Sequence, residues 1–505
     1  MRGGWSIRSL QSERGSRGVN RIQKISISTA AILLAAFPLT GQEPPRRTLV
    51  LSLDDALRIA AGESETVWVA EAGVMRAMGN ETIARSGLFP QIAGSAGYTR
   101  TLRSQFQDIN FGGPTGGEDG GDLGDLPFGR ENQYTLGLTL NQMVFDGGVF
   151  ARNRAAQARR RAAELDVVSA RAETLLDVTQ SYFDALLGDR LVEISESALG
   201  QTEEILRQTQ VGEEVGAQAE FDVLRARVQR DNQIPVVLQR RTERTEAYLR
   251  LKQLLNVPLE DEVQLTTPVE TLPERFAAPA DLSPDRRAPV IQAEENVRAS
   301  EAQVAEAQAE RLPAVYFSSR YAPVAYPESG VPEPDDFRED WTVSLNLNVP
   351  IFTSGRIRGT VQVARGTLSE ARARLQQTRE AAALDARVAQ NDLAEAQAAL
   401  ESNTATVEQG RRAYEIAQLR YREGISSQLE LTDARLSLEQ AEVNRARALR
   451  NVQVARARLS LLDELPLALS AGAALVQPVQ PIQQQQQQTP ATTVPGTTGF
   501  GGQQQ

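Results

Sequence analysis

A strand-and-glycine pattern occurs twice in this chain. Residues 134–148 read YTLGLTLNQMVFDGG, and residues 341–355, which begin 207 positions later, read WTVSLNLNVPIFTSG. In each copy apolar and polar residues alternate up to a glycine, and a long Ala-rich helical pattern follows. Alternation with a period of two predicts a strand with one apolar face, and apolar spacing of three and four predicts an amphipathic helix. The chain is therefore expected to be an internal duplication that joins strands to long helices.

Four strands are expected, two in each copy. The first starts at Ile92 and has an apolar face that Arg100 interrupts. The second starts at Tyr134, the third covers residues 315–321, and the fourth covers residues 341–349. The apolar side of the fourth strand consists of Trp341, Val343, Leu345, Leu347 and Val349.

Long helical patterns follow the second and fourth strands, over residues 149–211 and 356–422. At 1.5 Å per residue the first is about 95 Å long. Glycine-containing turns at 213–217 and 423–427 precede shorter return helices that end near residues 255 and 463. Two further helices are expected, one from Ser52, a candidate N-cap, to Gly87 and one over residues 290–310. A coiled-coil stripe is expected in the second long helix at Leu368, Ala371, Leu375, Leu393, Ala396 and Leu400.

Composition excludes several classes of function. The chain has no cysteine and no histidine, so disulfides, zinc–thiolate sites and Ser-His-Asp or Cys-His nucleophiles are excluded. The formal net charge of −11 disfavours nucleic acid as a partner. No phosphate-binding Gly-rich loop is present, so the energy source is expected to lie in a partner. No cofactor or metal is expected, and the chain is not expected to be an enzyme. An envelope-associated hydrolase therefore has little support.

The first 41 residues are expected to be an export signal. Six basic residues precede the apolar run 25–39, which is too short to span a bilayer comfortably. A single membrane anchor is the alternative, and a cleavage site is placed near Gly41. The Gly- and acid-rich segment 103–131 holds a candidate cation site, although a solvated loop is the simpler interpretation; its acidic residues are Glu118, Asp119, Asp122 and Asp125. The Gln-rich segment from residue 477 is expected to be disordered.

The predicted strands indicate that several copies of the chain assemble. Short strands with one apolar and one polar face are typical of membrane β-barrels. Within lipid every backbone N–H and C=O group must be paired, which forbids an open sheet edge. Four strands cannot close a barrel, because the smallest membrane barrels have about eight. Several copies of the chain are therefore expected to share one barrel.

From about residue 50 to residue 465, the chain resembles the TolC-type outer membrane efflux proteins. The resemblance rests on the duplicated plan, on the breaks at Pro90 and Pro313, on VFDGG and IFTSG, and on the segment AYEIAQLRYREGISSQLELTDARLSLEQA. The first-copy counterpart of that segment, VGEEVGAQAEFDVLRAR, aligns at an offset of about 208 and pairs Gly216 with Gly424 and Asp222 with Glu430.

The resemblance implies a mixed, mainly α-helical fold that forms a homotrimer. A shared 12-stranded outer membrane β-barrel, with four strands per chain, would continue into a periplasmic α-helical barrel of coiled coils. The expected divisions are a signal peptide (1–41), a first repeat (42–256), a Pro-rich equatorial connector (257–289), a second repeat (290–465) and a low-complexity tail (466–505).

The resemblance also assigns roles near the two turns. Glu430 and Asp433 share a helix face at i and i+3, and in a trimer they would form a ring of about six carboxylates that prefers cations. The alternative is a favourable interaction with the helix dipole. Asp222 and Tyr421 match latch positions that hold the tip closed, or else they are an ordinary N-terminal acid and a packed tyrosine. Ser426 replaces a basic residue of the family, which would weaken the latch. The candidates for tip turns and adaptor docking are Gly216, Gly424, Ile425 and Ser426.

The expected function is the outer membrane channel of a tripartite efflux or type I secretion system. It would conduct small molecules or polypeptide passively from an inner membrane RND or ABC transporter, through a periplasmic adaptor, and its barrel would contact outer membrane lipid. The alternative is a periplasmic coiled-coil scaffold without a pore.

Overall fold

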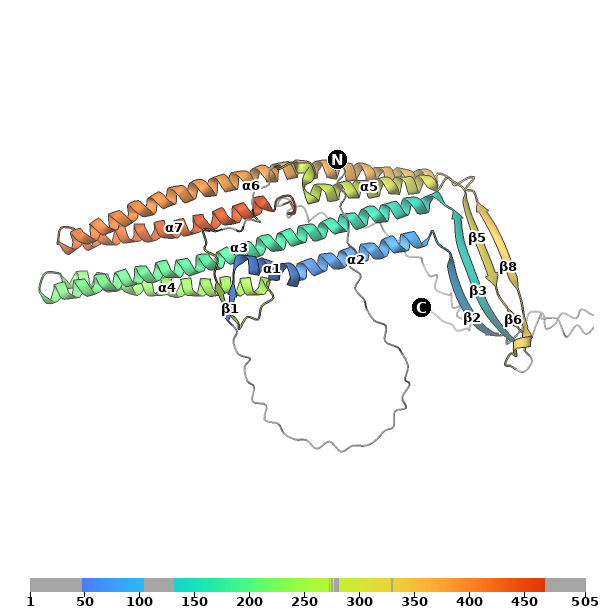
Figure 1. The fold of residues 1–505 in the computed structure, drawn as a ribbon, viewed down its shortest axis with the longest axis horizontal. Helices are drawn as coiled ribbons and strands as arrows, with labels where there is room; N and C mark the ends of the chain where they lie inside the picture. Colours follow the sequence, from blue (N-terminus) through green and yellow to red (C-terminus); the bar gives the residue numbers. More distant parts are fainter. Residues whose placement is uncertain are drawn as a thin grey trace, which may run out of the picture. The chain divides into compact units, whose positions relative to one another are not determined.

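The computed structural model describes residues 48–103, 131–271, 273, 276, 281–327 and 330–467. The expected signal segment, the four acidic residues Glu118, Asp119, Asp122 and Asp125, and the Gln-rich tail lie outside these residues. Figure 1 labels the elements in chain order. The strands are β1 (Thr48–Leu51), β2 (Gln91–Arg100), β3 (Asn132–Phe145), β4 (Glu262–Leu265), β5 (Ala314–Tyr321), β6 (Val324–Ala325), β7 (Phe337–Arg338) and β8 (Trp341–Asn348). The α-helices are α1 (Leu53–Glu63), α2 (Glu65–Ser86), α3 (Gly147–Glu214), α4 (Glu220–Leu254), α5 (Ala288–Ala309), α6 (Arg356–Arg422) and α7 (Gln428–Ser460).

The two copies have the expected succession of strands, long helix and return helix. β3 leads into α3 at Asp146, whose side chain caps the helix by accepting a hydrogen bond from the N–H of Gly148 at 2.8 Å. β8 leads into α6 through Gly355, which has a positive φ of 86°. The helices α3 and α6 have 68 and 67 residues, which at 1.5 Å per residue makes each about 100 Å long. Each therefore places a strand at one end and a helical turn at the other.

The single helix expected over residues 52–87 is wrong, because two helices occupy this segment. Ser52 caps α1 as expected, and its hydroxyl accepts from the N–H of Asp55 at 3.1 Å. The backbone then becomes extended at Ser64 (φ −77°, ψ 120°), and α2 begins at Glu65. The buried Ser64 hydroxyl lies 3.2 Å from the hydroxyl of Thr174 on α3. A contact with a residue 110 positions away is invisible to helical periodicity.

The Pro-rich connector contains a strand that alternation does not predict. Within it, β4 pairs in parallel with β1, from Thr48 opposite Glu262 to Leu51 opposite Leu265. Four residues are too few to show a period, and the partner lies more than 200 positions away. The strands β6 and β7, in the loop expected before residue 341, escape prediction because two residues each are too few to show a period.

The remaining strands form a six-stranded sheet. Its order is β7-β6-β3-β5-β8, with β2 paired along β3. β2 pairs with β3, β3 with β5, and β5 with β8, in every case antiparallel. In this described sheet, one long edge of β2 and one long edge of β8 have no neighbouring strand.

The helices pack in a row through small side chains. α2 packs on α3, α3 on α5, and α5 on α6, while α4 and α7 pack on α3 and α6 as antiparallel hairpins (Figure 1). The expected stripe of α6 from Leu368 to Leu400 is half-buried. Between α5 and α6 lies the fully buried Arg287, whose Nη1 donates to the carboxylate of Asp385 at 2.7 Å. None of the helices that the structure describes has the length and apolar content needed to cross a bilayer.

Candidate functional site

The sheet has one apolar and one polar face, and the strand register keeps the two faces separate. Ile92 on β2 lies opposite Leu140 on β3, and Ala96 lies opposite Leu136. On the other side of the sheet, Leu345 of β8 lies opposite Phe317 of β5. The residues between them are polar or small: Thr135, Gly137, Thr139, Asn141, Ser318, Thr342, Ser344, Asn346 and Asn348.

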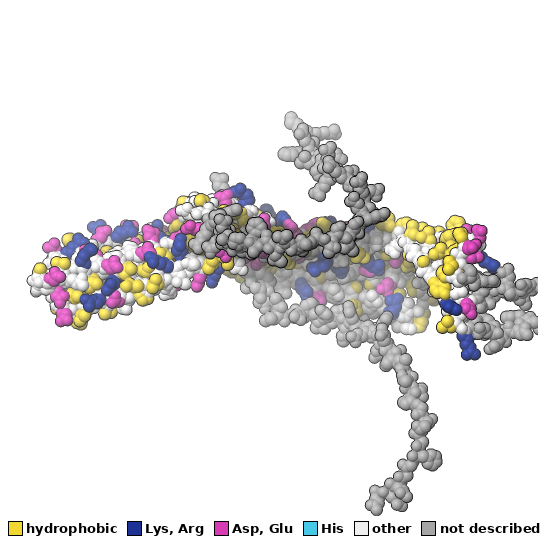
Figure 2. Space-filling model, turned by 90° about the horizontal axis from the view of Figure 1, so that it is seen from below, with side chains coloured by type: hydrophobic (Ala, Val, Ile, Leu, Met, Phe, Trp, Pro, Cys, Tyr) yellow, Lys and Arg dark blue, Asp and Glu magenta, His cyan; other side chains and the backbone are white. Residues whose placement is uncertain are grey.

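The apolar face is open to its surroundings. Ile92, Leu138, Val343, Leu345 and Leu347 are each more than half exposed. In Figure 2, hydrophobic side chains gather over the sheet at the right of the view, whereas charges of both signs are interspersed along the helices. A continuous exposed apolar surface of this kind is a surface for lipid.

Aromatic pairs mark the end of the sheet away from the long helices. Tyr98 and Tyr134 are cross-strand partners with ring centroids 4.7 Å apart. Tyr321 and Trp341 are also partners, with centroids 6.4 Å apart in an edge-to-face arrangement. Membrane barrels carry such aromatic residues where the apolar band meets water.

The two helical turns at the opposite ends of α3 and α6 have the same backbone geometry. Gly216 and Gly424 both have positive φ, 75° and 69°, which glycine adopts at no steric cost. The carbonyl of Gly212 accepts from residues 217 and 218, as the carbonyl of Arg420 does from residues 425 and 426. The prediction of left-handed glycines is confirmed, and the offset of 208 holds for each hydrogen bond.

The two hairpins, α3–α4 and α6–α7, share one apolar cluster near these turns. The cluster draws on all four helices and consists of Ile205, Leu206, Val223, Ala226, Tyr414, Ala417, Tyr421, Leu431 and Leu438. Burial raises the pKa of Tyr414, against smaller opposing effects of Arg435 and Arg422. The hairpins are therefore held together by a buried apolar contact, and its burial favours the neutral form of Tyr414.

The structure places Tyr421 inside this cluster but does not bring it to Asp222. The hydroxyl of Tyr421 lies 3.1 Å from that of Thr209 on α3, and both side chains are buried. Asp222 is half-buried in the first turn of α4, and among the described residues no hydrogen bond joins it to Tyr421. The tyrosine thus bridges the two hairpins within one chain, through a partner that the sequence did not reveal.

Polar contacts continue this junction along α4 and α7. The amide of Gln229 donates to the hydroxyl of Thr432 at 3.0 Å, and Gln233 donates to the carboxylate of Glu439 at 3.1 Å. Side-chain pairs more than 200 positions apart give no local signal in the sequence. They align the two hairpins along their length.

Glu430 and Asp433 lie in the first turns of α7, and both are exposed. Ser427 caps this helix, and its hydroxyl accepts from the N–H of Glu430. The Glu430 carboxylate also faces the guanidinium of Arg420 on α6, with an N–O distance of 3.1 Å. Sequence reasoning missed Arg420, although a signal existed: Arg420 and Glu430 are each five positions from Ile425, and such positions face each other across a hairpin.

The residues expected to dock an adaptor lie at the surface of the second turn. Ile425 is 68% exposed. Ser426 is half-buried, and its hydroxyl lies near the carbonyl of Ala417 at 3.5 Å. An exposed apolar residue beside a fixed turn is a suitable contact for another protein.

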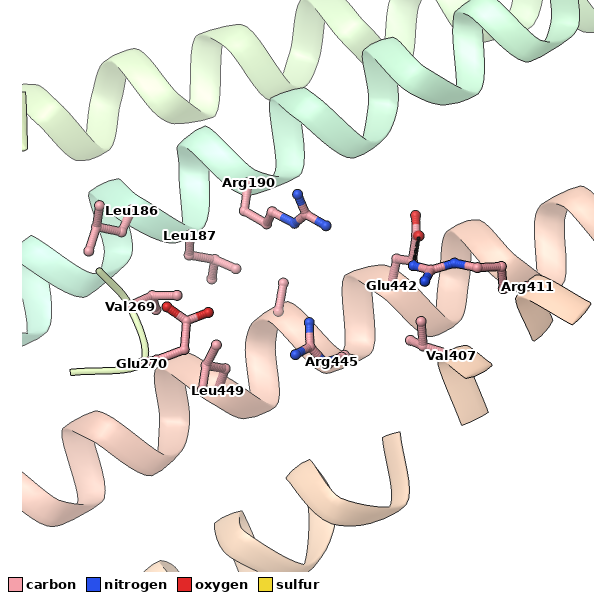
Figure 3. Close-up of a pocket in the computed structure, with 11 residues that line it drawn as sticks. Leu186, Leu187, Arg190, Val269, Glu270, Val407, Arg411, Glu442, Arg445 and Leu449 are labelled. Atoms are coloured by element: carbon pink, nitrogen blue, oxygen red, sulfur yellow. Dashed lines mark ion pairs between the residues drawn. The ribbon is translucent and has the colours of Figure 1, made fainter. Parts of the chain in front are cut away.

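A separate cavity of about 300 Å³ lies where the connector meets α3, α6 and α7. Figure 3 shows Arg190, Arg445 and Glu270 around this space, with Glu442 paired to Arg411 at 3.6 Å. Charges of both signs line it together with Leu186, Leu187, Val269, Val407, Ala446 and Leu449. This mixture of apolar side chains and charges of both signs is not a set of groups converging on one reacting atom.

Comparison with known proteins places this geometry among outer membrane proteins. The family model described as outer membrane efflux protein matches residues 56–257 and 282–463. Pyoverdine export outer membrane protein OpmQ of Pseudomonas aeruginosa is 25% identical over 313 residues, which are 61% of this chain and 62% of that protein. Nodulation protein T of Rhizobium leguminosarum bv. viciae is 24% identical over 380 residues, 73% of this chain and 75% of that protein.

Solved structures share the fold at low sequence identity. The CmeC outer membrane channel of Campylobacter jejuni superposes with a TM-score of 0.68 at 19% identity, covering 84% of this chain and 88% of that one. The outer membrane protein VceC of Vibrio cholerae gives 0.67 at 20% identity, covering 81% and 96%.

Proposed function

Because the chain belongs to the outer membrane efflux protein family, we propose that it is the outer membrane channel of a tripartite efflux or type I secretion system. It conducts small molecules or polypeptide passively from an inner membrane RND or ABC transporter, through a periplasmic adaptor. Energy comes from that transporter. The names of the relatives concern pyoverdine export and nodulation. The proposal therefore concerns the channel and does not name a transported substrate.

The observation that carries this proposal is the described sheet, which exposes an apolar face and leaves one long edge of β2 and one long edge of β8 unpaired. Strand edges in lipid need partners, because an unpaired backbone group there costs several kcal/mol. In a homotrimer, β8 of one copy pairs with β2 of the next, and the four long strands of each copy make a twelve-stranded barrel. The closed sheet is the shared wall of the channel.

The helices support the same closure. α2 and α6 lie at the two ends of the helical row, and both expose apolar side chains. Val69, Met75 and Ile83 on α2 are 74%, 68% and 71% exposed, and Val363 on α6 is 71% exposed. Packing of α2 on the next copy's α6 buries these side chains and continues the barrel as a helical tube.

The tip residues take roles in this channel. Glu430 and Asp433 line the narrow entrance and favour cations there, because acidic rings select cations at a constriction. Tyr421 holds the two hairpins of one chain together, and Asp222, which is free of that contact, faces the neighbouring copy. Gly216 and Gly424 set the turns, and Ile425 and Ser426 contact the adaptor. Opening is a rearrangement of the tip helices.

Two measurements on the purified mature protein test the proposal. Electrophoresis in SDS without heating is expected to show a trimer that heating dissociates. Planar bilayers that receive the protein are expected to show ionic conductance. A soluble monomer without conductance would instead favour the periplasmic scaffold, because a scaffold needs neither lipid nor a pore.

A further inference from the structure

We propose that Arg420 sets the ion preference of the tip by neutralising Glu430, so that Asp433 carries the uncompensated charge. This inference rests on the proposed function of Glu430 and Asp433 at the entrance. If Glu430 lines that entrance, Arg420 lines it too, because Nη1 of Arg420 lies 3.1 Å from a carboxylate oxygen of Glu430. Both side chains are nearly half exposed, so the pair remains in contact with passing ions.

The backbone of the turn fixes Arg420 opposite Glu430. The carbonyl of Arg420 accepts from the N–H of Ile425 at 2.8 Å and from that of Ser426 at 3.3 Å. The hydroxyl of Ser427 caps α7 and accepts from the N–H of Glu430. Both members of the pair are therefore anchored by the turn itself, and their facing positions do not depend on the ion pair.

The first hairpin is an internal control. Its turn has the same hydrogen bonds, but Gly212 occupies the place equivalent to Arg420, and Asp222 that of Glu430. The acid of the first turn thus has no arginine across from it. Because the same turn forms around Gly212, the fold does not require the guanidinium, and its presence beside Glu430 concerns charge.

The net charge of these three side chains predicts how the ion preference of the entrance changes in each variant. Two carboxylates and one guanidinium leave one net negative charge at the entrance in each subunit. Removing Arg420 doubles that charge, removing either acid cancels it, and removing both acids makes it positive. At a distance of about 10 Å, an effective dielectric constant of about 20 and about 0.1 M salt, one charge changes the local ion concentration about threefold.

The test measures the K⁺ to Cl⁻ permeability ratio of the full-length trimer in planar bilayers under a KCl gradient. Arg420→Ala is expected to raise the ratio at least about ninefold, because one charge raises the local K⁺ concentration about threefold and lowers the local Cl⁻ concentration about threefold. Glu430→Ala combined with Asp433→Ala is expected to lower the ratio below one. Arg420→Ala combined with Glu430→Ala is expected to restore the original ratio. Arg420→Lys keeps the charge and should keep the ratio.

Arg422→Ala is the matched control. Arg422 lies on the same helix, but two positions correspond to about 200° around it, so its side chain points away from Glu430. The control should change the ratio less than Arg420→Ala does. Unheated electrophoresis verifies that each variant is a trimer.

The outcomes distinguish a failure of the proposed gate from a failure of the role proposed for Arg420. A chain that never conducts, or that conducts with a ratio unmoved by losing both acids, overturns the proposed gate and this inference together. A ratio that falls when Glu430 is removed but stays constant when Arg420 is removed overturns this inference alone. If Arg420→Ala and Arg422→Ala change the permeability ratio equally, this inference is also overturned. The ratio would then depend on the overall charge of the tip and not on the pair of Arg420 with Glu430.

Discussion

The hydroxyl of Tyr421 lies 3.1 Å from the hydroxyl of Thr209, and this contact joins the two helical hairpins inside one chain. Thr209 already donates its hydrogen to the carbonyl of Ile205 at 2.8 Å, so Tyr421 is the donor between the hydroxyls. The bond therefore belongs to the packing of α6 on α3.

Tyr421→Phe should loosen the closed tip. The change removes one buried hydrogen bond, worth about 1 kcal/mol, and about a fivefold increase in open probability is expected in single-channel recordings. Tyr414→Phe is the control, because Tyr414 lies seven positions earlier in the same apolar cluster. Equal open probabilities for the two variants would show that the hydroxyl of Tyr421 does not hold the tip.

Tyr182→Phe should destabilise the connector region. The fully buried Tyr182 hydroxyl donates to the carbonyl of Leu51 at 3.1 Å and accepts from the N–H of Thr267 at 3.0 Å. Its loss leaves the N–H of Thr267 unpaired and removes one of the two hydrogen bonds to the Leu51 carbonyl, which still accepts from the N–H of Thr266. This should lower the free energy of unfolding by about 1–3 kcal/mol. Thermal unfolding followed by circular dichroism measures this. The exposed Tyr316 gives the comparison, and a Tyr316→Phe variant as unstable as Tyr182→Phe would contradict the prediction.

Gly188→Ala should weaken the packing of α4 on α3. A Cβ atom at Gly188 would lie 3.1 Å from the Cα of Arg244, where backbone must move. We expect a loss of about 1–3 kcal/mol in the free energy of unfolding. Gly200→Ala, in the same helix but with open space around it, should instead stabilise by about 0.5–1 kcal/mol. Chemical denaturation measures the free energy of unfolding of both variants. A Gly188→Ala protein as stable as Gly200→Ala would contradict the close packing of the Arg244 backbone on Gly188.

Leu345→Arg should impair insertion into the outer membrane. Leu345 lies on the apolar face and is 69% exposed, and an arginine facing lipid near the midplane costs about 2–4 kcal/mol. Its neighbour Ser344 lies on the polar face, so Ser344→Arg should be tolerated. The amount of heat-dissociable trimer in outer membrane fractions measures the difference. Similar amounts for both variants would mean that the two faces of β8 are not in different environments.

Local patterns predicted much of this protein. The alternation in β2, β3, β5 and β8 depends only on neighbouring residues, because side chains in a strand point to opposite faces in turn. The turns at Gly216 and Gly424 are local as well, since a positive φ favours glycine. The long helices follow from apolar spacing over many turns. The roles of Asp222, Glu430 and Asp433 remain predictions from family resemblance.

Other features were decided only by contacts between distant segments. The break at Ser64, the pairing of β1 with β4, and the bridge from Tyr421 to Thr209 each join residues more than 100 positions apart. A single sequence carries no periodic trace of such contacts, because each depends on how complete elements pack. The sequence by itself thus determined the four long strands, the long helices and the turns between them. The tertiary structure decided the short strands, the break at Ser64 and which side chains meet, because buried polar groups need hydrogen-bond partners that only the packing of distant segments supplies.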